Sequence, residues 1–252
     1  MKIDFEKTPN INVDCVIGFG DGCRVAGNLK KNNLRFFSTP FDWQMNYSLE
    51  TVFSLIKNRG KTFFKNYKID SKYNRGNRLG LVDTDTGMVS IHDFNKFLPK
   101  KINELIFKYK NKRRFDRLDK ILQDAQNICI VTNRSITTQE ILSFVKNFLT
   151  LYTFNRLYFI NVYENNNKIT DETLIKTEIN NVTILEYYFK DEHPNGSNRQ
   201  TNPEYWHGHI VYWNKIFSKI ILNKKFLRKY ISYRMVIIKK LKTVFSALQN
   251  LF

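Results

Sequence analysis

The sequence predicts an α/β protein with a layered sheet, parallel strand pairings and flanking helices. Short apolar segments alternate with amphipathic segments of helical length, most clearly at 128–133, 137–152 and 156–164. Strands that are joined through a helix usually pair in parallel. The chain has 252 residues, of which 42% are hydrophobic, enough for one sizeable core. We expect an α/β domain at 1–217 and a basic amphipathic helical tail at 218–252.

The first elements expected are a strand, a glycine-rich turn and a helix. Residues 14–20 are a short buried strand, 20–22 are Gly-Asp-Gly, and 23–33 have helical apolar spacing. An extended segment at 34–43 ends at a proline-initiated turn. A helix at 48–59 follows, with Ser48 as its N-cap. Residues 73–94 alternate around an Asp-Thr-Gly turn and predict a hairpin.

The second half of the chain repeats the alternation of helix and strand. A polar and basic helix is expected at 101–126, and a strand at 128–133. The helix at 137–152 has Thr137 or Thr138 near its start and Glu140 in its first turn. Further strands are expected at 156–164 and 182–189. Residues 192–209 are a polar loop whose aromatic side chains anchor it to the body, and one or two helices occupy 210–252.

Cys23 stands where the glycine-rich turn becomes a helix. A helix N-terminus lowers the pKa of a cysteine and offers N–H groups to an oxyanion. Gly20, Gly22 and Arg24 surround this position and would shape the oxyanion site. The structural alternative is that Cys23 only packs in the turn. Cys15 and Cys129 lie inside apolar strands and are expected to be inert core residues.

A thiol nucleophile needs a base, and His92 at the end of the predicted hairpin is the candidate. Asn133, after the strand at 128–133, has the chemistry to orient the imidazole, and Asp42 is the competing choice. Each also has a structural interpretation: His92 is a surface or core histidine, and Asp42 caps a turn or binds an arginine. The residues alone leave these alternatives open.

The motifs around Cys23 add a resemblance. Gly18-Phe19-Gly20, Cys23-x-x-Ala-x-x-Leu, an arginine at 35, Ser38 and Pro-Phe-Asp-Trp at 40–43 resemble the opening signature of the family called putative papain-like cysteine peptidases. Ile-His-Asp-Phe at 91–94 and the basic segment 112–118 before the strand at 128–133 are also similar. The resemblance spans about residues 12 to 217. It implies a Cys23 nucleophile with His92 as its base. The chain has Gly-Phe-Gly where the family more often has Ser-Leu-Gly.

Other candidate sites are weaker. Gly-x-Gly-x-Gly at 18–22 lacks the spacing of a dinucleotide fingerprint, so we expect no cofactor. His207-x-His209, with His193 nearby, lacks the further ligands of a tetrahedral site, so no metal is expected. Arg113, Arg114 and Arg117 form a basic helix face. This face is either solvated surface or a clamp for a phosphate or acidic sugar.

The net charge of +18 indicates an anionic partner. Ten basic residues and no acidic residue lie between Lys215 and the C-terminus. The tail at 218–252 is therefore expected to lie on an anionic membrane surface, with nucleic acid as a weaker alternative and packing on the core as a third. Three cysteines without metal-ligand spacing, no signal segment and no long apolar run predict a cytoplasmic protein, peripheral at the membrane if the tail binds there.

Two functions remain in competition. The first is a cysteine-dependent hydrolase, of papain-like peptidase or acyl-transfer type, that acts on a peptide, acyl or glycan substrate. The second is a non-catalytic module, linked to surface polysaccharide and recruited to the membrane by the basic tail. Reactivity of Cys23 that depends on His92 separates them.

Overall fold

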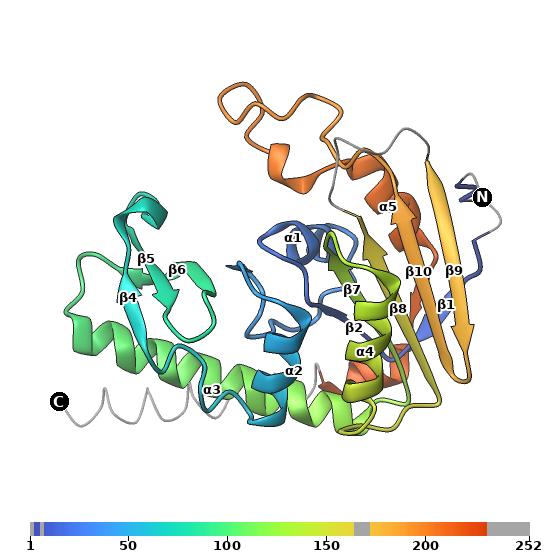
Figure 1. The fold of residues 1–252 in the computed structure, drawn as a ribbon, viewed down its shortest axis with the longest axis horizontal. Helices are drawn as coiled ribbons and strands as arrows, with labels where there is room; N and C mark the ends of the chain where they lie inside the picture. Colours follow the sequence, from blue (N-terminus) through green and yellow to red (C-terminus); the bar gives the residue numbers. More distant parts are fainter. Residues whose placement is uncertain (1–2, 6–7, 164–171, 231–252) are drawn as a thin grey trace.

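The computed structural model describes residues 3–5, 8–163 and 172–230. Its centre is a five-stranded sheet in the order β2-β7-β8-β10-β9 (Figure 1). The first four strands pair in parallel, and β9 is added antiparallel to β10. This confirms the layered α/β fold with parallel pairings. The strand bounds are Cys15–Gly18 (β2), Asn127–Asn133 (β7), Arg156–Val162 (β8), Thr173–Ile179 (β9) and Val182–Tyr188 (β10).

Helices cover both faces of this sheet because its strands are apolar on both sides. Ile17 and Ile130 belong to one buried cluster, and their neighbours Val16 and Val131 belong to the other. The first cluster is covered by helices α2, α3 and α4, and the second by α1 and α5. The helix bounds are Arg24–Lys31 (α1), Leu49–Lys57 (α2), Lys100–Asp124 (α3), Thr138–Phe148 (α4) and Ile210–Ser218 (α5).

Two predicted helix starts are confirmed in atomic detail. Ser48 accepts a hydrogen bond from the Thr51 amide at the start of α2. Thr137 and Glu140 form a reciprocal capping box at the start of α4. Both caps are local, because each joins residues three apart, and so they can be recognised in the sequence.

A second, four-stranded antiparallel sheet lies beside the N-terminal half of α3 (Figure 1). Its order is β3-β6-β5-β4, and the predicted hairpin forms β5 and β6. The sequence analysis did not predict β3, β4 or the edge strand β9, which are short or largely exposed. The bounds are Gln44–Met45 (β3), Tyr67–Ile69 (β4), Arg78–Asp83 (β5) and Val89–Asn95 (β6).

The segment at 218–252, expected to be a helical tail, contains a short strand near its start. Residues Ile220–Leu222 form β11, which pairs in parallel with β1 (Ile11–Val13). Residues 224–230 are helical, and Phe226 and Tyr230 pack against the core. The Tyr230 hydroxyl donates to Asp124 at the end of α3. Residues 231–252, with most of the predicted amphipathic stripe, lie outside the described part of the chain.

No helix within the described ranges is both long enough and apolar enough to span a bilayer.

Candidate active site

The turn that carries Cys23 is held by hydrogen bonds to two segments distant in sequence. The Asp21 amide donates to Asn133 Oδ1 at 3.1 Å, and the Gly22 amide donates to the Gln44 carbonyl at 2.7 Å. Gly22 has φ +80°, which favours glycine. A Cβ on Gly20 would lie 2.4 Å from Asn133 Oδ1, so a side chain there would collide with Asn133. The two glycines thus let the chain turn sharply and present Cys23 at the start of α1.

Cys23 and His92 meet across 69 positions of sequence. The distance from Cys23 Sγ to His92 Nε2 is 3.8 Å, within reach of a sulfur hydrogen bond. Cys23 is the N-cap of α1, and His92 is on β6 of the smaller sheet. The Trp43 ring lies edge-on to the imidazole, with ring centres 5.9 Å apart. The structure therefore brings together the two residues that the sequence analysis selected as nucleophile and base.

Burial governs the protonation of this pair. It raises the pKa of the Cys23 thiol to about 11. No hydrogen bond from the first turn of α1 reaches the Cys23 side chain. The expectation of a thiol made acidic by the helix N-terminus is therefore wrong for the protein at rest. Burial, assisted by the cations Arg78 and Lys110, lowers the pKa of His92, so the imidazole is neutral at pH 7 and can accept a proton.

The raised thiol pKa gives a first testable prediction. Direct alkylation of Cys23 by iodoacetamide requires the thiolate, so its rate should keep rising above about pH 9. Peptide mass spectrometry after timed labelling measures this rate. Cys15 and Cys129 serve as internal controls, because both are buried in the core and should remain unlabelled. A plateau below about pH 8 would instead show a resting thiolate–imidazolium pair.

Neither candidate for the third catalytic residue hydrogen-bonds to His92 in the described part of the chain. Asn133 is buried behind the turn, where it holds the Asp21 amide. Asp42 is also buried, and it accepts from Arg35 Nε at 2.8 Å and from the Thr39 hydroxyl at 2.8 Å. Asp42 therefore has the structural role that the sequence analysis gave as its alternative: it caps a turn and binds an arginine. The imidazole is positioned by packing against Trp43.

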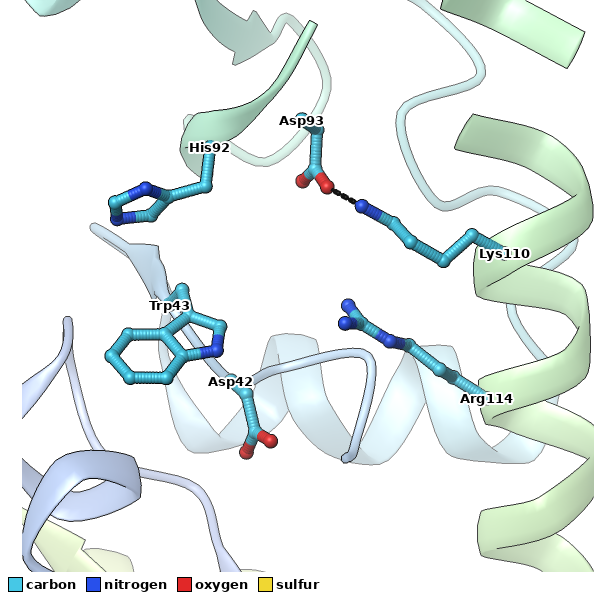
Figure 2. A pocket seen from close by; sticks show the side chains of 6 residues that line it. All are labelled: Asp42, Trp43, His92, Asp93, Lys110 and Arg114. Carbon is cyan, nitrogen blue, oxygen red and sulfur yellow. Dashed lines mark hydrogen bonds and ion pairs between the residues drawn. The ribbon is translucent and has the colours of Figure 1, made fainter. Parts of the chain in front are cut away.

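A cavity of about 360 Å³ opens beside the imidazole. Figure 2 shows His92 and Trp43 on one side of it and the long side chains of Lys110 and Arg114, from α3, on the other. Asp93, one residue after His92, accepts from Lys110 and from Ser90. Burial, Arg114 and Arg78 lower the pKa of Lys110 to about 8, so the ammonium is still charged at pH 7.

Only one of the three arginines of the predicted anion clamp reaches this cavity. Arg114 lines it, Arg113 is exposed, and Arg117 is half-buried and does not line it. The three residues share one helix, but only Arg114 lies one turn from Lys110 on the side that lines the cavity together with β6.

The comparison with protein families follows this geometry. A family model described as "Putative papain-like cysteine peptidase (DUF1796)" matches residues 14–182. The chain belongs to this family of putative papain-like cysteine peptidases. The matched range includes Cys23, His92 and all six residues that line the cavity. The comparisons with curated proteins and with solved structures found no match.

A loop that follows the range matched by the cysteine peptidase family also reaches the site. Arg24 donates to Asp191 Oδ2 at 3.0 Å and to the Trp206 carbonyl at 3.1 Å. The Trp206 ring lies 6.4 Å from that of Trp43. Arg24 therefore uses its guanidinium to hold the loop beside α1. The loop is anchored as predicted, with Trp206 as an anchor, whereas Asp191 was missed.

Arg134 is a second residue that the sequence analysis missed. It is buried, and its guanidinium donates to the carbonyls of Phe19 and Tyr47. These contacts join the end of β2 to the segment before α2. An arginine after a buried strand gives no local signal for this role, because its acceptors are backbone atoms far away in sequence.

The two histidines that the sequence analysis considered as weak metal ligands, His207 and His209, make structural contacts. His207 is buried and stacks on Trp206, and burial lowers its pKa to about 4. His209 Nδ1 accepts from the Tyr212 amide at the start of α5. Across residues 3–5, 8–163 and 172–230, no group of three or more His, Cys, Asp or Glu side chains is placed to hold a metal ion.

Proposed function

We propose that this protein is a cysteine-dependent hydrolase that cleaves an acyl bond, with Cys23 as nucleophile and His92 as general base. The observation that carries the proposal is the 3.8 Å contact between Cys23 Sγ and His92 Nε2. A neutral imidazole beside a neutral thiol is the arrangement that general-base catalysis requires. Membership of a family described as putative cysteine peptidases supports a peptide bond as the bond cleaved.

The geometry suggests the order of events. As the sulfur attacks the substrate carbonyl, the thiol proton passes to His92 Nε2. The oxyanion of the tetrahedral intermediate faces the N–H groups in the first turn of α1, which lack acceptors within the helix. The leaving group then takes the proton from His92, and a thioester on Cys23 remains. Water, deprotonated by His92, hydrolyses the thioester and regenerates the thiol.

Among the described residues no carboxylate pairs with the imidazole, which is consistent with this role. An aspartate in contact with His92 would raise its pKa and favour a resting ion pair with the thiol. The Asp93 side chain is instead engaged by Lys110 and Ser90. His92 thus stays neutral until the sulfur attacks.

The test is to trap the acyl-enzyme. Incubation with p-nitrophenyl acetate should acetylate Cys23, as mapped by peptide mass spectrometry, and Cys23→Ser should abolish the thioester. Unfolded protein in urea provides the control for non-specific acetylation. If Cys23 reacts no faster in the folded protein than in urea, the hydrolase proposal fails and the non-catalytic binding module is favoured.

A further inference from the structure

The cavity beside His92 is lined almost entirely by polar and charged side chains. Six residues form its wall: Asp42, Trp43, His92, Asp93, Lys110 and Arg114. They come from the turn before β3, from β6 and from α3, so the cavity lies where the smaller sheet meets the long helix (Figure 2). Because His92 lines it, a molecule in this cavity would lie next to the proposed base, which contacts Cys23 Sγ at 3.8 Å.

The wall residues carry two negative charges, on Asp42 and Asp93, and two positive charges, on Lys110 and Arg114, while Arg35 behind the wall adds a third positive charge at Asp42. Asp42 is engaged by Arg35 and Thr39, and its side chain is 3% exposed. The Asp93 carboxylate is paired with Lys110. Each carboxylate therefore already has its own cation.

Arg114 is the cation that remains. In the described part of the chain, its guanidinium has no hydrogen bond or ion pair, although it is half-buried and within the field of Asp42. Arg78 adds a further positive field at His92. A half-buried guanidinium without a bound acceptor is poorly solvated, so an added oxyanion would be stabilised there.

We propose that this cavity binds an anionic group of the substrate, a carboxylate or a phosphate, next to the bond that Cys23 attacks. The inference rests on the proposed hydrolase function and specifies its substrate class. The planar guanidinium of Arg114 provides two parallel N–H donors for the oxyanion. The ammonium of Lys110, paired with Asp93, lies on the same wall. An uncharged substrate group would leave Arg114 half-buried without an acceptor.

Matched alkylating probes test the charge preference without a known substrate. The α-amides of N-iodoacetyl-glutamate and N-iodoacetyl-glutamine differ only in whether the side chain ends in a carboxylate or in a neutral carboxamide, and the α-amide of N-iodoacetyl-phosphoserine tests a phosphate. The measured quantity is the second-order rate of Cys23 alkylation at one fixed pH in the full chain. We expect at least one anionic probe to react about 10- to 100-fold faster than the glutamine probe. The faster of the two distinguishes carboxylate from phosphate.

Two variants on α3 provide the matched comparison. Arg114→Gln should remove most of the preference for the anionic probe, measured as the ratio of the anionic to the neutral rate within that variant. Arg113→Gln removes the same charge from an exposed position of the same helix and should keep the preference. High salt should reduce the preference in the unsubstituted protein.

The outcomes separate the two proposals. Equal rates for all probes, or a preference lost equally in Arg113→Gln and Arg114→Gln, would overturn the anionic subsite. In that case Cys23 would still be acetylated by p-nitrophenyl acetate, and the hydrolase proposal would remain. If Cys23 is alkylated by none of the probes in the folded protein, the sulfur is inaccessible and both proposals fail.

Discussion

Replacing His92 with glutamine lowers the rate of Cys23 acetylation at pH 7 by about 10²- to 10⁴-fold, the usual contribution of a general base. The reason is that the Cys23 thiol has its pKa raised to about 11, so very little thiolate exists at pH 7 without a base. The measurement is the initial burst of p-nitrophenol, with the acetylated residue identified by mass spectrometry.

The pH dependence gives this prediction a second readout. The pKa of His92 is lowered below its usual 6.5, so the base is lost only as the pH falls through that lower value. The acetylation rate of the unsubstituted protein should therefore be independent of pH above pH 6.5, where the imidazole is neutral. In His92→Gln only the thiolate reacts, so its rate should climb continuously toward the thiol pKa of about 11. The two rates should converge at high pH.

A structural role for His92 predicts something else. The His92 side chain is only partly buried and keeps much of its surface open to solvent, so the substitution should leave the unfolding midpoint unchanged. If His92→Gln lowers the rate equally at pH 7 and at high pH, or shifts the midpoint, then His92 supports the fold and is not the base.

Replacing Asp191 with alanine reduces the free energy of unfolding by about 3–5 kcal/mol, the usual cost of breaking a buried ion pair. The Asp191 side chain is fully buried, and it accepts from Arg24, from the His209 amide and from Trp213 Nε1. Alanine leaves all three donors without this acceptor. Urea denaturation followed by circular dichroism measures the loss.

Two comparisons make this prediction specific. Asp191→Asn keeps an oxygen for the His209 amide and the Trp213 indole, so it should cost less than alanine. Glu204→Gln removes the partner of Lys31 in an exposed pair of the same loop and should not shift the midpoint measurably. A loss below about 1 kcal/mol in Asp191→Ala would show that the carboxylate is not a buried anchor.

The same substitution connects the loop to the site. Arg24 lies next to Cys23 and holds both Asp191 and the Trp206 carbonyl. Trp206 in turn lies beside Trp43, which packs against His92. Asp191→Ala should therefore also slow acetylation of Cys23 under conditions in which the variant is still folded.

Local features of the fold could be predicted because neighbouring residues determine them. The caps at Ser48 and Thr137 are formed by residues three positions further along the chain. Cys15 and Cys129 were placed in the core from their apolar strands, and both are fully buried. The strand at 220–222 was missed because its partner β1 lies about 200 residues earlier, and a tail of basic and apolar residues favours a helix on composition.

The sequence by itself determined the α/β alternation, the position of Cys23 at the start of a helix, and His92 as the candidate base, which the family signature also implied. Only the tertiary structure decided that the two side chains meet, that Asp42 and Asn133 serve the turns instead of the imidazole, and that Arg114 alone of three arginines reaches the cavity. It also decided the protonation of the pair. A sequence motif specifies the local backbone conformation. How deeply a side chain is buried, which face of a helix meets the site and which group pairs with a charge depend instead on how distant parts of the chain pack together.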